Sequence, residues 1–412
     1  MLRQLSFTPS AESPVRAMSG IAKQRWIFLA TVMLVGLSLR PFITAIGPLA
    51  GVIGAETGLG LTGLSLLTLI PILLMGAMAF AAPPLRARFG ERRLMLAALS
   101  LLALGSGLRL WVAEGWQLVA TAALLGVGAA LIQALFPGVV KARFPQRAGL
   151  MMGLYSGMLM GGGALGARLA PLIAGATGDW HLGLGWVAAL PVLGLLLARR
   201  VLPAAAGTKG NAADHDRLIA RPRIWLLMLC FGLVNGGYSS VVAWLAPFYQ
   251  EQGQSAAQSG GLLAILTLCQ AAAALGLPVL AGCGPDRRGW IWLALAMQAA
   301  GFLGLVLRPD LHPWLLAGIL GAGLGGCFSL SLIVALEHAA DPGRAGAISA
   351  LMQGGGFLIA ALPPFVLAQI HRMTGSFTMG WALHLTCVAV VAGLVLRLAP
   401  QGYARALRAG GT

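Results

Sequence analysis

The sequence predicts an all-α polytopic membrane protein whose twelve transmembrane helices form two pseudo-symmetric six-helix halves. Three observations support this prediction. The chain is 58% hydrophobic and only 10% charged, with a mean hydropathy of +0.84, whereas soluble domains carry roughly 25% charged residues. Apolar runs of about 20 residues, the length that crosses a bilayer, recur along the chain. Segments of the second half also repeat segments of the first half in the same order.

Each apolar run is followed by a polar or charged connection, and together the runs make twelve spans. The first 25 residues lack a short apolar core with a cleavage site, so the first span is expected to act as the insertion signal. The predicted spans cover residues 26–53, 62–84, 94–113, 117–140, 148–177, 184–198, 223–249, 257–282, 290–307, 314–338, 346–370 and 378–397.

A polar connection near the middle of the chain separates six spans from the other six. The predicted segments are an N-terminal segment (1–25), a first bundle (26–198), a central linker (199–222), a second bundle (223–398) and a C-terminal tail (399–412).

The distribution of positive charge predicts the orientation. Most of the 28 lysines and arginines lie in the terminal segments, the central linker and every second loop. Cytoplasmic loops carry an excess of Lys and Arg, so both termini and the linker are expected in the cytoplasm, with the chain in the cell inner membrane. A nucleic-acid partner is not expected, because it would require basic residues gathered on one solvated face.

The two halves repeat each other at an offset of about 195 residues. Because each half has an even number of spans, the copies share one orientation, and parallel repeats place a solute site near midplane between them. The matched pairs are "LMGGGALGARLAP" (159–171) with "LMQGGGFLIAALPP" (351–364), "FPQRAG" (144–149) with "DPGRAG" (341–346), and "LLGVGAA" (124–130) with "ILGAGLG" (319–325).

Twelve spans, a cytoplasmic linker and duplicated halves resemble the major facilitator superfamily. The loop "RARFGERR" (86–93) is similar to the family's loop signature, although Pro83 and Ala87 stand where the family has Gly and Asp. In the family this loop holds two helices together on the cytoplasmic side. The resemblance implies a cytoplasmic gate made by Arg88, Gly90 and Arg92 in the first copy and by Asp286 and Arg287 in the second.

A closer resemblance, to the cyanate and nitroimidazole transporter subfamily, covers nearly the whole chain. It rests on "LRPFITAIGPL", "IQALFPGVVKARFPQR", "GLVNGGYSSVVAWLAPFY", "MQGGGF" and "WALHL". It implies a secondary carrier for cyanate or another small anion, working by alternating access. The alternative it leaves open is an exporter of nitroimidazole-like or other amphipathic drugs. The residues it implicates are Arg40, Gln133, Asn235, Tyr238, Gln353 and His384, whereas Arg168 departs from the small residue expected there.

Arg40 is the strongest candidate for binding the solute. A cation in mid-membrane costs about 2.5–3.5 kcal/mol even on the lenient insertion scale, and arginine cannot deprotonate. All twelve carboxylates fall in loops or at span ends, so no acidic partner is expected at that depth. A guanidinium offers two parallel donors to a planar anion. The alternative is a structural role, in which Arg40 caps the carbonyls of a helix broken beside Pro41.

Five further polar residues carry two interpretations each. Arg168 either joins Arg40 in one cavity or extends to water near the outer third of its span, and Arg109, Arg308 and Arg372 fall at outer span ends, where long side chains reach water. His384 either carries a coupling proton or packs in the core. Gln133, Gln270 and Gln353 are single amides that either line the pathway or bond neighbouring helices.

The stretch "GLVNGGYSSVVAW" (232–244) is the richest polar segment of the second half. Asn235, Tyr238 and Ser239 share one helical stripe, and Gly236 and Gly237 are expected to loosen the helix. These side chains either face a solute path or bond neighbouring helices, and Trp244 is a candidate cavity wall.

No motif indicates an enzyme, a metal site or a cofactor. The glycine-rich segments 160–166 and 353–358 lack a following Lys-Ser/Thr, so they are not nucleotide loops. The five cysteines form no metal-binding or redox spacing. Without buried acids, a carboxylate proton relay is not expected. The expected partners are a small solute, a possible coupling proton and the lipid bilayer, with the protein a monomer.

Overall fold

The computed structural model describes residues 14–143, 148–202, 218–282, 284, 286–339 and 341–403. Within these ranges every regular element is a helix, and twelve helical segments are long and apolar enough to cross a membrane. The twelve predicted spans are confirmed. Residues 1–13 and 404–412 of the predicted terminal segments, the loop around residue 145 and most of the central linker lie outside the described residues.

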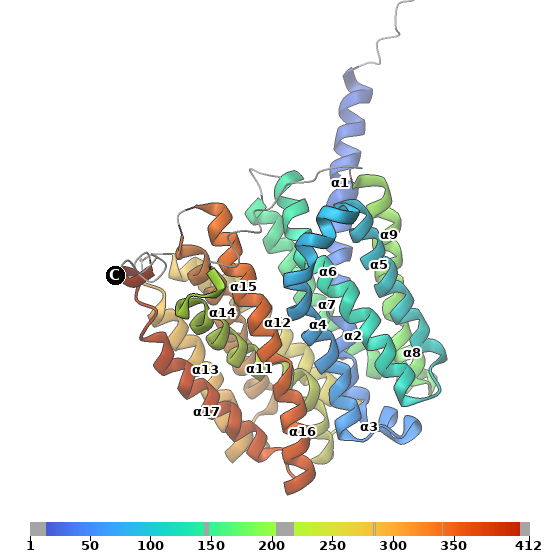
Figure 1. Cartoon of the computed structure of the whole chain (residues 1–412). Coiled ribbons are helices and arrows are strands. Elements are labelled where there is room, and N and C mark those ends of the chain that lie inside the picture. The colour runs from blue at the N-terminus through green and yellow to red at the C-terminus, as the bar shows by residue number, and fades with distance from the viewer. Residues whose placement is uncertain are drawn as a thin grey trace, which may run out of the picture.

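The chain forms two bundles that lie side by side, as the change of colour from blue and green to yellow and red shows (Figure 1). The first bundle contains α1 (Pro14–Ser38), α2 (Pro41–Thr44), α3 (Ile46–Thr57), α4 (Leu61–Phe89), α5 (Glu91–Leu108), η1 (Arg109–Trp111), α6 (Gly115–Arg143), α7 (Ala148–Thr177), α8 (Trp180–Gly185), η3 (Trp186–Ala188) and α9 (Ala189–Val201).

The second bundle repeats this order of helices. It contains α11 (Pro222–Glu251), α12 (Ala256–Ala281), α13 (Arg288–Leu307), α14 (Pro313–Glu337), α15 (Pro342–Ala360), α16 (Leu362–Thr374), α17 (Thr378–Val395) and η4 (Pro400–Gly402). The bundles meet where α7 packs on α12, α4 packs on α15 and α16, and α3 packs on α11.

The two ends of the molecule are built differently. At the linker end, where α9 finishes and α11 begins, the α4–α5 turn uses Gly90 at φ 79°. At the opposite end, called the far end here, four helices finish at glycines whose φ lies between 70° and 89°. Glycine adopts this left-handed conformation without strain, which ends a helix tightly. These four glycines are Gly58, Gly178, Gly253 and Gly375.

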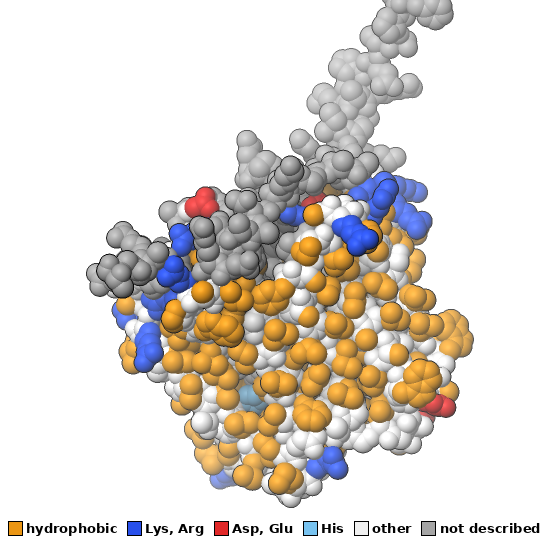
Figure 2. All heavy atoms as spheres, in the orientation of Figure 1, with side chains coloured by type: hydrophobic (Ala, Val, Ile, Leu, Met, Phe, Trp, Pro, Cys, Tyr) orange, Lys and Arg blue, Asp and Glu red, His pale blue; other side chains and the backbone are white. Residues whose placement is uncertain are grey.

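The surface matches a chain that spans a bilayer. Figure 2 shows hydrophobic side chains covering the middle of one face, with Lys and Arg gathered along the edge nearest the linker end. Exposed apolar residues such as Leu104, Leu196 and Val279 contribute to such a surface. Since no water reaches the hydrocarbon, all-helical spans satisfy their own backbone groups there.

Three predicted spans differ in detail from the observed helices. The first is broken into α1, α2 and α3 around Arg40, and the eleventh is divided into α15 and α16 at Ala361. Both breaks lie beside prolines, which cannot donate the helical hydrogen bond. The expectation that Gly236 and Gly237 loosen the seventh span is wrong: α11 runs unbroken through both glycines, because close packing on neighbouring helices stabilises it there.

Candidate functional site

The break in the first span places Arg40 between two helices. α1 ends at Ser38, Arg40 is the N-cap of α2, and Pro41 is the first residue of α2. Because Pro41 has no N–H, the Leu37 carbonyl four residues earlier loses its helical donor. α2 is only four residues long and is entirely buried, so the arginine is held at the tip of a short helix inside the protein.

Two neighbouring elements fix α2. The Thr44 hydroxyl donates to the Gly163 carbonyl of α7 at 2.8 Å. A Cβ added at Gly166 would lie 2.5 Å from the Pro41 Cα, so only glycine allows this approach. On another side, the Arg109 Nη1 donates to the Phe42 carbonyl at 2.9 Å. α2 is therefore clamped between α7 and η1.

The Arg40 side chain is 6% exposed. Its guanidinium carbon lies 5.0 Å from the centre of the Tyr238 ring on α11, across the boundary between the bundles. This is a cation–π geometry, which stabilises a desolvated cation by about 2 kcal/mol. Within the described part of the chain, no carboxylate pairs with this guanidinium, and its Nε is buried without a hydrogen-bond acceptor. The cation thus keeps its hydrogen-bonding capacity for another group.

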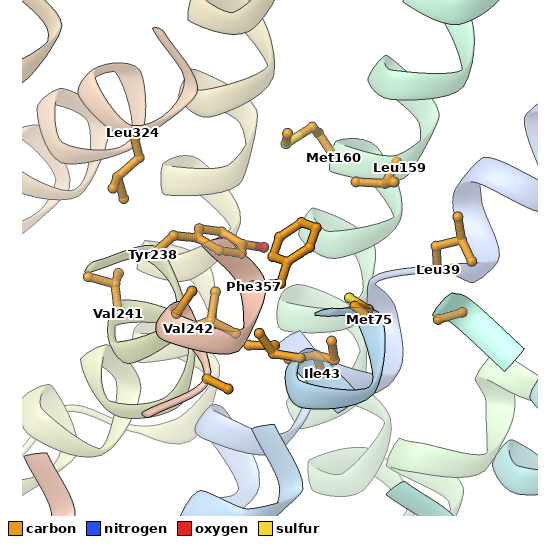
Figure 3. Packing of buried hydrophobic residues seen from close by; sticks show 14 of the residues in the cluster. Leu39, Ile43, Met75, Leu159, Met160, Tyr238, Val241, Val242, Leu324 and Phe357 are labelled. Atoms are coloured by element: carbon orange, nitrogen blue, oxygen red, sulfur yellow. The ribbon is translucent and has the colours of Figure 1, made fainter. Parts of the chain in front are cut away.

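Apolar side chains surround this meeting point of the two bundles. Figure 3 shows the Tyr238 hydroxyl pointing toward Phe357, with Met160, Met75 and Ile43 around them. All of these residues are buried. In such surroundings a charge is poorly screened and interacts strongly with a counter-charge. The geometry suits an anion that loses its hydration shell at modest cost.

The predicted amides lie on separate helices and already make hydrogen bonds. The Asn235 Nδ2 donates to the Phe231 carbonyl at 2.8 Å, and the Gln353 Nε2 donates to the Ser349 hydroxyl at 3.3 Å. The Gln133 Nε2 contacts the Met75 sulfur at 3.5 Å. Gln270 is buried on α12, and its Oε1 has no hydrogen-bond partner among the described residues. Of the predicted polar residues, only Tyr238 contacts Arg40 directly.

Trp244 makes its contacts inside the second bundle. Its side chain is fully buried, and the indole Nε1 donates to the Pro364 carbonyl of α16 at 2.8 Å. Trp244 thus joins α11 to α16, and Phe377 packs against its ring. These contacts give the indole a structural role inside the second bundle, and its place in a cavity wall stays a prediction.

Arg168 and His384 also lie apart from Arg40. Arg168 is exposed, and its Nη1 donates to the Ala257 carbonyl at the far end. This is the water-reaching alternative, and the two arginines do not share one site. His384 is buried beside Gly237, and its ring stacks on Phe302 with centroids 5.2 Å apart. These contacts match the packing alternative for His384.

The predicted gate residues make contacts within their own bundles. In the first bundle Arg88 is exposed against Phe89, and Arg92 donates to the Arg199 carbonyl at 3.0 Å. In the second bundle Arg287 pairs with Glu337 at 2.8 Å. Arg288 pairs with Asp286 at 2.7 Å, and this hydrogen-bonded pair holds the pKa of the Asp286 carboxyl below its ordinary value.

Polar contacts between the bundles lie at the far end. The Gln250 Nε2 donates to the Pro48 carbonyl at 2.9 Å, the Gln369 Nε2 donates to the Thr62 hydroxyl at 3.1 Å, and Arg168 contacts Ala257 as described above. Among the described residues, the side-chain hydrogen bonds of the linker end join segments of one bundle only. Side-chain hydrogen bonds thus join the two bundles at the far end.

The expectation that Arg109 reaches water is wrong. Arg109 is 0% exposed, and its guanidinium bonds the Phe42 carbonyl and the Thr121 hydroxyl inside the bundle. One signal in the sequence marks it: Trp111 and Trp116 are the exposed aromatic residues expected at a membrane interface, and Arg109 lies on the membrane side of both. Thr44 was missed because nothing in the sequence indicates its partner 119 residues away.

Comparisons with known proteins agree with this architecture. The family model described as Major Facilitator Superfamily matches residues 27–364. The chain is 41% identical over 374 residues to the cyanate transport protein CynX of Escherichia coli (strain K12), covering 90% of this chain and 97% of that one. It is 30% identical over 380 residues to the 2-nitroimidazole transporter of the same organism, covering 90% and 94%.

Solved structures share the fold at lower identity. A D-xylose–proton symporter superposes with a TM-score of 0.74 at 15% identity, covering 91% of this chain and 98% of the other. A bacterial homologue of the human lysosomal transporter Spinster superposes with a TM-score of 0.72 at 15% identity, covering 94% and 99%.

Proposed function

Because this chain belongs to the major facilitator superfamily, whose members here are transporters, we propose that it carries cyanate or a similarly small monovalent anion across the cell inner membrane. Arg40 is the anion-binding residue in this proposal. The relative that shares 41% of its sequence is named for cyanate transport, which supports this class of solute.

A single observation carries the assignment of Arg40. Its guanidinium is buried between the two bundles, and the described chain gives it a ring to stack on but no carboxylate. The competing structural role is capping the carbonyls of the broken helix, and one of these, the Phe42 carbonyl, already accepts from Arg109. Two parallel N–H groups of Arg40 can then receive a small anion.

The proposed cycle is alternating access by the two bundles around this site. The hydrogen bonds between bundles lie at the far end, which supports a state that is closed there. We place the linker end and both termini in the cytoplasm, because Lys and Arg gather at that end. In the opposite state the gate loops around Gly90 and Asp286 would approach each other. We propose that the carrier works as a monomer, and a coupling proton remains a prediction.

Tyr238 is the first candidate for orienting the solute, since it touches both the cation and the apolar wall. Gln133, Asn235 and Gln353 would have to exchange the hydrogen bonds they now make for bonds to the solute. Their contribution to affinity is therefore expected to be smaller than that of Arg40.

The test is binding of potassium cyanate to the purified full-length protein, measured by isothermal titration calorimetry. Arg40→Ala removes two charge-assisted hydrogen bonds, each contributing about 1.5–3 kcal/mol, so Kd should rise at least roughly 100-fold. Arg308→Ala, which removes an exposed arginine after α13, is the matched control and should bind as the wild type does. Equal Kd values for Arg40→Ala and the wild type, with both proteins folded, would contradict the site assignment.

A second candidate function is export of nitroimidazole-like compounds. The apolar side chains around Tyr238 and the 30% identity to a 2-nitroimidazole transporter favour it. Uptake of labelled cyanate into proteoliposomes, competed by 2-nitroimidazole, separates the two. Cyanate counterflow without competition supports the anion carrier, whereas 2-nitroimidazole transport without cyanate counterflow supports the exporter.

A further inference from the structure

Arg40 and Arg109 are the two lysine or arginine residues classed as buried in the described part of the chain, and both attach to α2. Arg40 is the residue that precedes α2. Arg109 donates from Nη1 to the carbonyl of Phe42, the second residue of α2. Burying a guanidinium is costly, so a second buried cation at the same four-residue helix requires an explanation.

The Arg109 side chain is held in a single orientation. Its Nε donates to the Thr121 Oγ1 of α6 at 3.3 Å, and this hydroxyl donates in turn to the Leu118 carbonyl at 2.7 Å. The guanidinium thus connects three elements: η1, α6 and α2. None of these contacts involves an acidic residue, so the interaction is with backbone and hydroxyl oxygens.

The Phe42 carbonyl is the group that needs this donor. It lies at the interruption between α2 and α3, where Ala45 makes a turn. A buried carbonyl without a donor costs several kcal/mol in the absence of water. A charged donor satisfies it strongly and directionally. Arg109 therefore determines how α2 sits relative to η1, while the Thr44 hydroxyl determines how it sits relative to α7.

We propose that Arg109 is a positioning residue for anion binding: by clamping the Phe42 carbonyl, it fixes α2 and thereby the direction in which Arg40 extends toward Tyr238. This inference rests on the proposed function. Arg40 is the N-cap of α2, so a rotation of this four-residue helix moves the root of its side chain directly. A purely structural Arg109 would stabilise the fold and leave the affinity of the folded protein unchanged.

The experiment uses the full-length protein in detergent, with freshly dissolved potassium cyanate as the probe. Kd is measured by calorimetry and the unfolding midpoint by a thermal ramp. Arg109→Met, which keeps the apolar stem of the side chain but removes its donors, should raise Kd at least roughly 10-fold. Arg109→Lys, which keeps one charged donor but loses the fork of the guanidinium, should bind more tightly than Arg109→Met and less tightly than the wild type. Arg308→Met, at an exposed arginine after α13, is the control and should leave Kd unchanged.

Two further outcomes separate this inference from the proposed function. If the wild type binds no cyanate, the proposed function fails. If the wild type binds cyanate and folded Arg109→Met binds it equally well, the positioning role is overturned even where the unfolding midpoint has dropped. Should Arg109→Met not fold, Thr121→Val decides. It frees the Arg109 Nε from its acceptor and should raise Kd severalfold, whereas an unchanged Kd overturns the proposal.

Discussion

The first helix of each half occupies the same place in the repeat, yet the two are built differently. In the first bundle this helix is broken into α1, α2 and α3, and Arg40 lies at the break. In the second bundle α11 is a single helix of 30 residues with Tyr238 near its middle. The fifth span of each half differs in the opposite sense. In the first bundle this span is the continuous helix α7, whereas in the second bundle it is divided into α15 and α16.

Each break is stabilised by a side chain from a neighbouring element. The Phe42 carbonyl accepts from Arg109, and the Ala360 carbonyl accepts from the Ser239 hydroxyl of α11 at 2.6 Å. Pro364 cannot donate to the Ala360 carbonyl, and Ser239 supplies the missing donor. The difference teaches that the breaks at Pro41 and Ala361 lie in non-equivalent spans, and that of these two only the first has a cation beside it. The second half supplies the ring that receives this cation.

We expect the largest effect on stability from adding a methyl group at the contact between α7 and α2. In Gly166→Ala, the new Cβ would lie 2.5 Å from the Pro41 Cα and 2.7 Å from the Pro41 carbonyl oxygen. Both atoms belong to the backbone, so the cost should reach the upper part of the range for overpacking, about 3 kcal/mol. A thermal ramp in detergent should show a much lower unfolding midpoint and weaker cyanate binding.

Two other glycines test whether this cost is specific to the broken helix. A Cβ at Gly161 meets nothing within 4 Å, so Gly161→Ala is the matched control and should leave the midpoint unchanged or slightly higher. In the second bundle, a Cβ at Gly356 would meet the Phe231 ring at 2.4 Å, and a ring can shift. Gly356→Ala should therefore cost less than Gly166→Ala. Equal midpoints for these two variants would contradict the comparison.

The second effect concerns the break in the second bundle. Ser239→Ala leaves the buried Ala360 carbonyl without its donor, which should destabilise the protein by about 1–3 kcal/mol. Ser240 is an internal control, because its hydroxyl is buried with no hydrogen-bond partner in the described chain. Ser240→Ala should be neutral or stabilising. A midpoint for Ser239→Ala as high as that of Ser240→Ala would show that the break does not depend on this donor.

Much of the fold could be predicted from the sequence because bilayer thickness constrains it. Twelve apolar runs, the polar linker and the repeat predict twelve helices in two halves, and Arg40 is conspicuous because no acid lies at its depth. Proline positions indicate where a helix can break, but glycine pairs do not: α11 is continuous at Gly236 and Gly237. Local flexibility is overridden there by packing, which the sequence of a single helix does not reveal.

The contacts of the candidate site were harder to predict because they join residues far apart in the chain. Arg109 reaches Phe42 across 67 positions. Its burial depends on how the end of α5 packs against α2 and α6, which the sequence of one helix does not reveal. The single amides could not be assigned either, since Asn235 faces its own helix backbone whereas Gln133 faces another helix.

The smallest expected effect is on the pH dependence of the unfolding midpoint. It comes from a difference between two loops at the far end that are nearly identical in structure. Thr177-Gly178-Asp179 precedes α8, and Thr374-Gly375-Ser376 precedes α17. In each, the threonine hydroxyl donates to the carbonyl four residues earlier at 2.8 Å, and the glycine has φ near 70°. The loops differ in two groups that titrate, Asp179 and His181. The Asp179 carboxylate accepts from the His181 backbone N–H at 2.8 Å and lies 2.8 Å from the His181 Nδ1, whereas the Ser376 hydroxyl accepts from the Thr378 backbone N–H.

This difference predicts a dependence on pH that is confined to the first bundle. Hydrogen bonds from His181 hold the pKa of the Asp179 carboxyl below its ordinary value. A depressed pKa means that the interaction stabilises the fold above the ordinary carboxyl pKa of about 3.9 and that this contribution is lost as the pH falls below it. Asp179→Ser copies the second loop, so the difference in unfolding midpoint between wild type and variant should shrink as the pH falls from 6 to about 3.5. Glu56 accepts from the neighbouring Trp180 indole in both the wild type and the variant, so its own titration cancels in the difference between their unfolding midpoints. Because Asp179 is partly exposed, the effect should be smaller than that of Ser239→Ala, and a difference that stays constant with pH would contradict a role for this carboxylate.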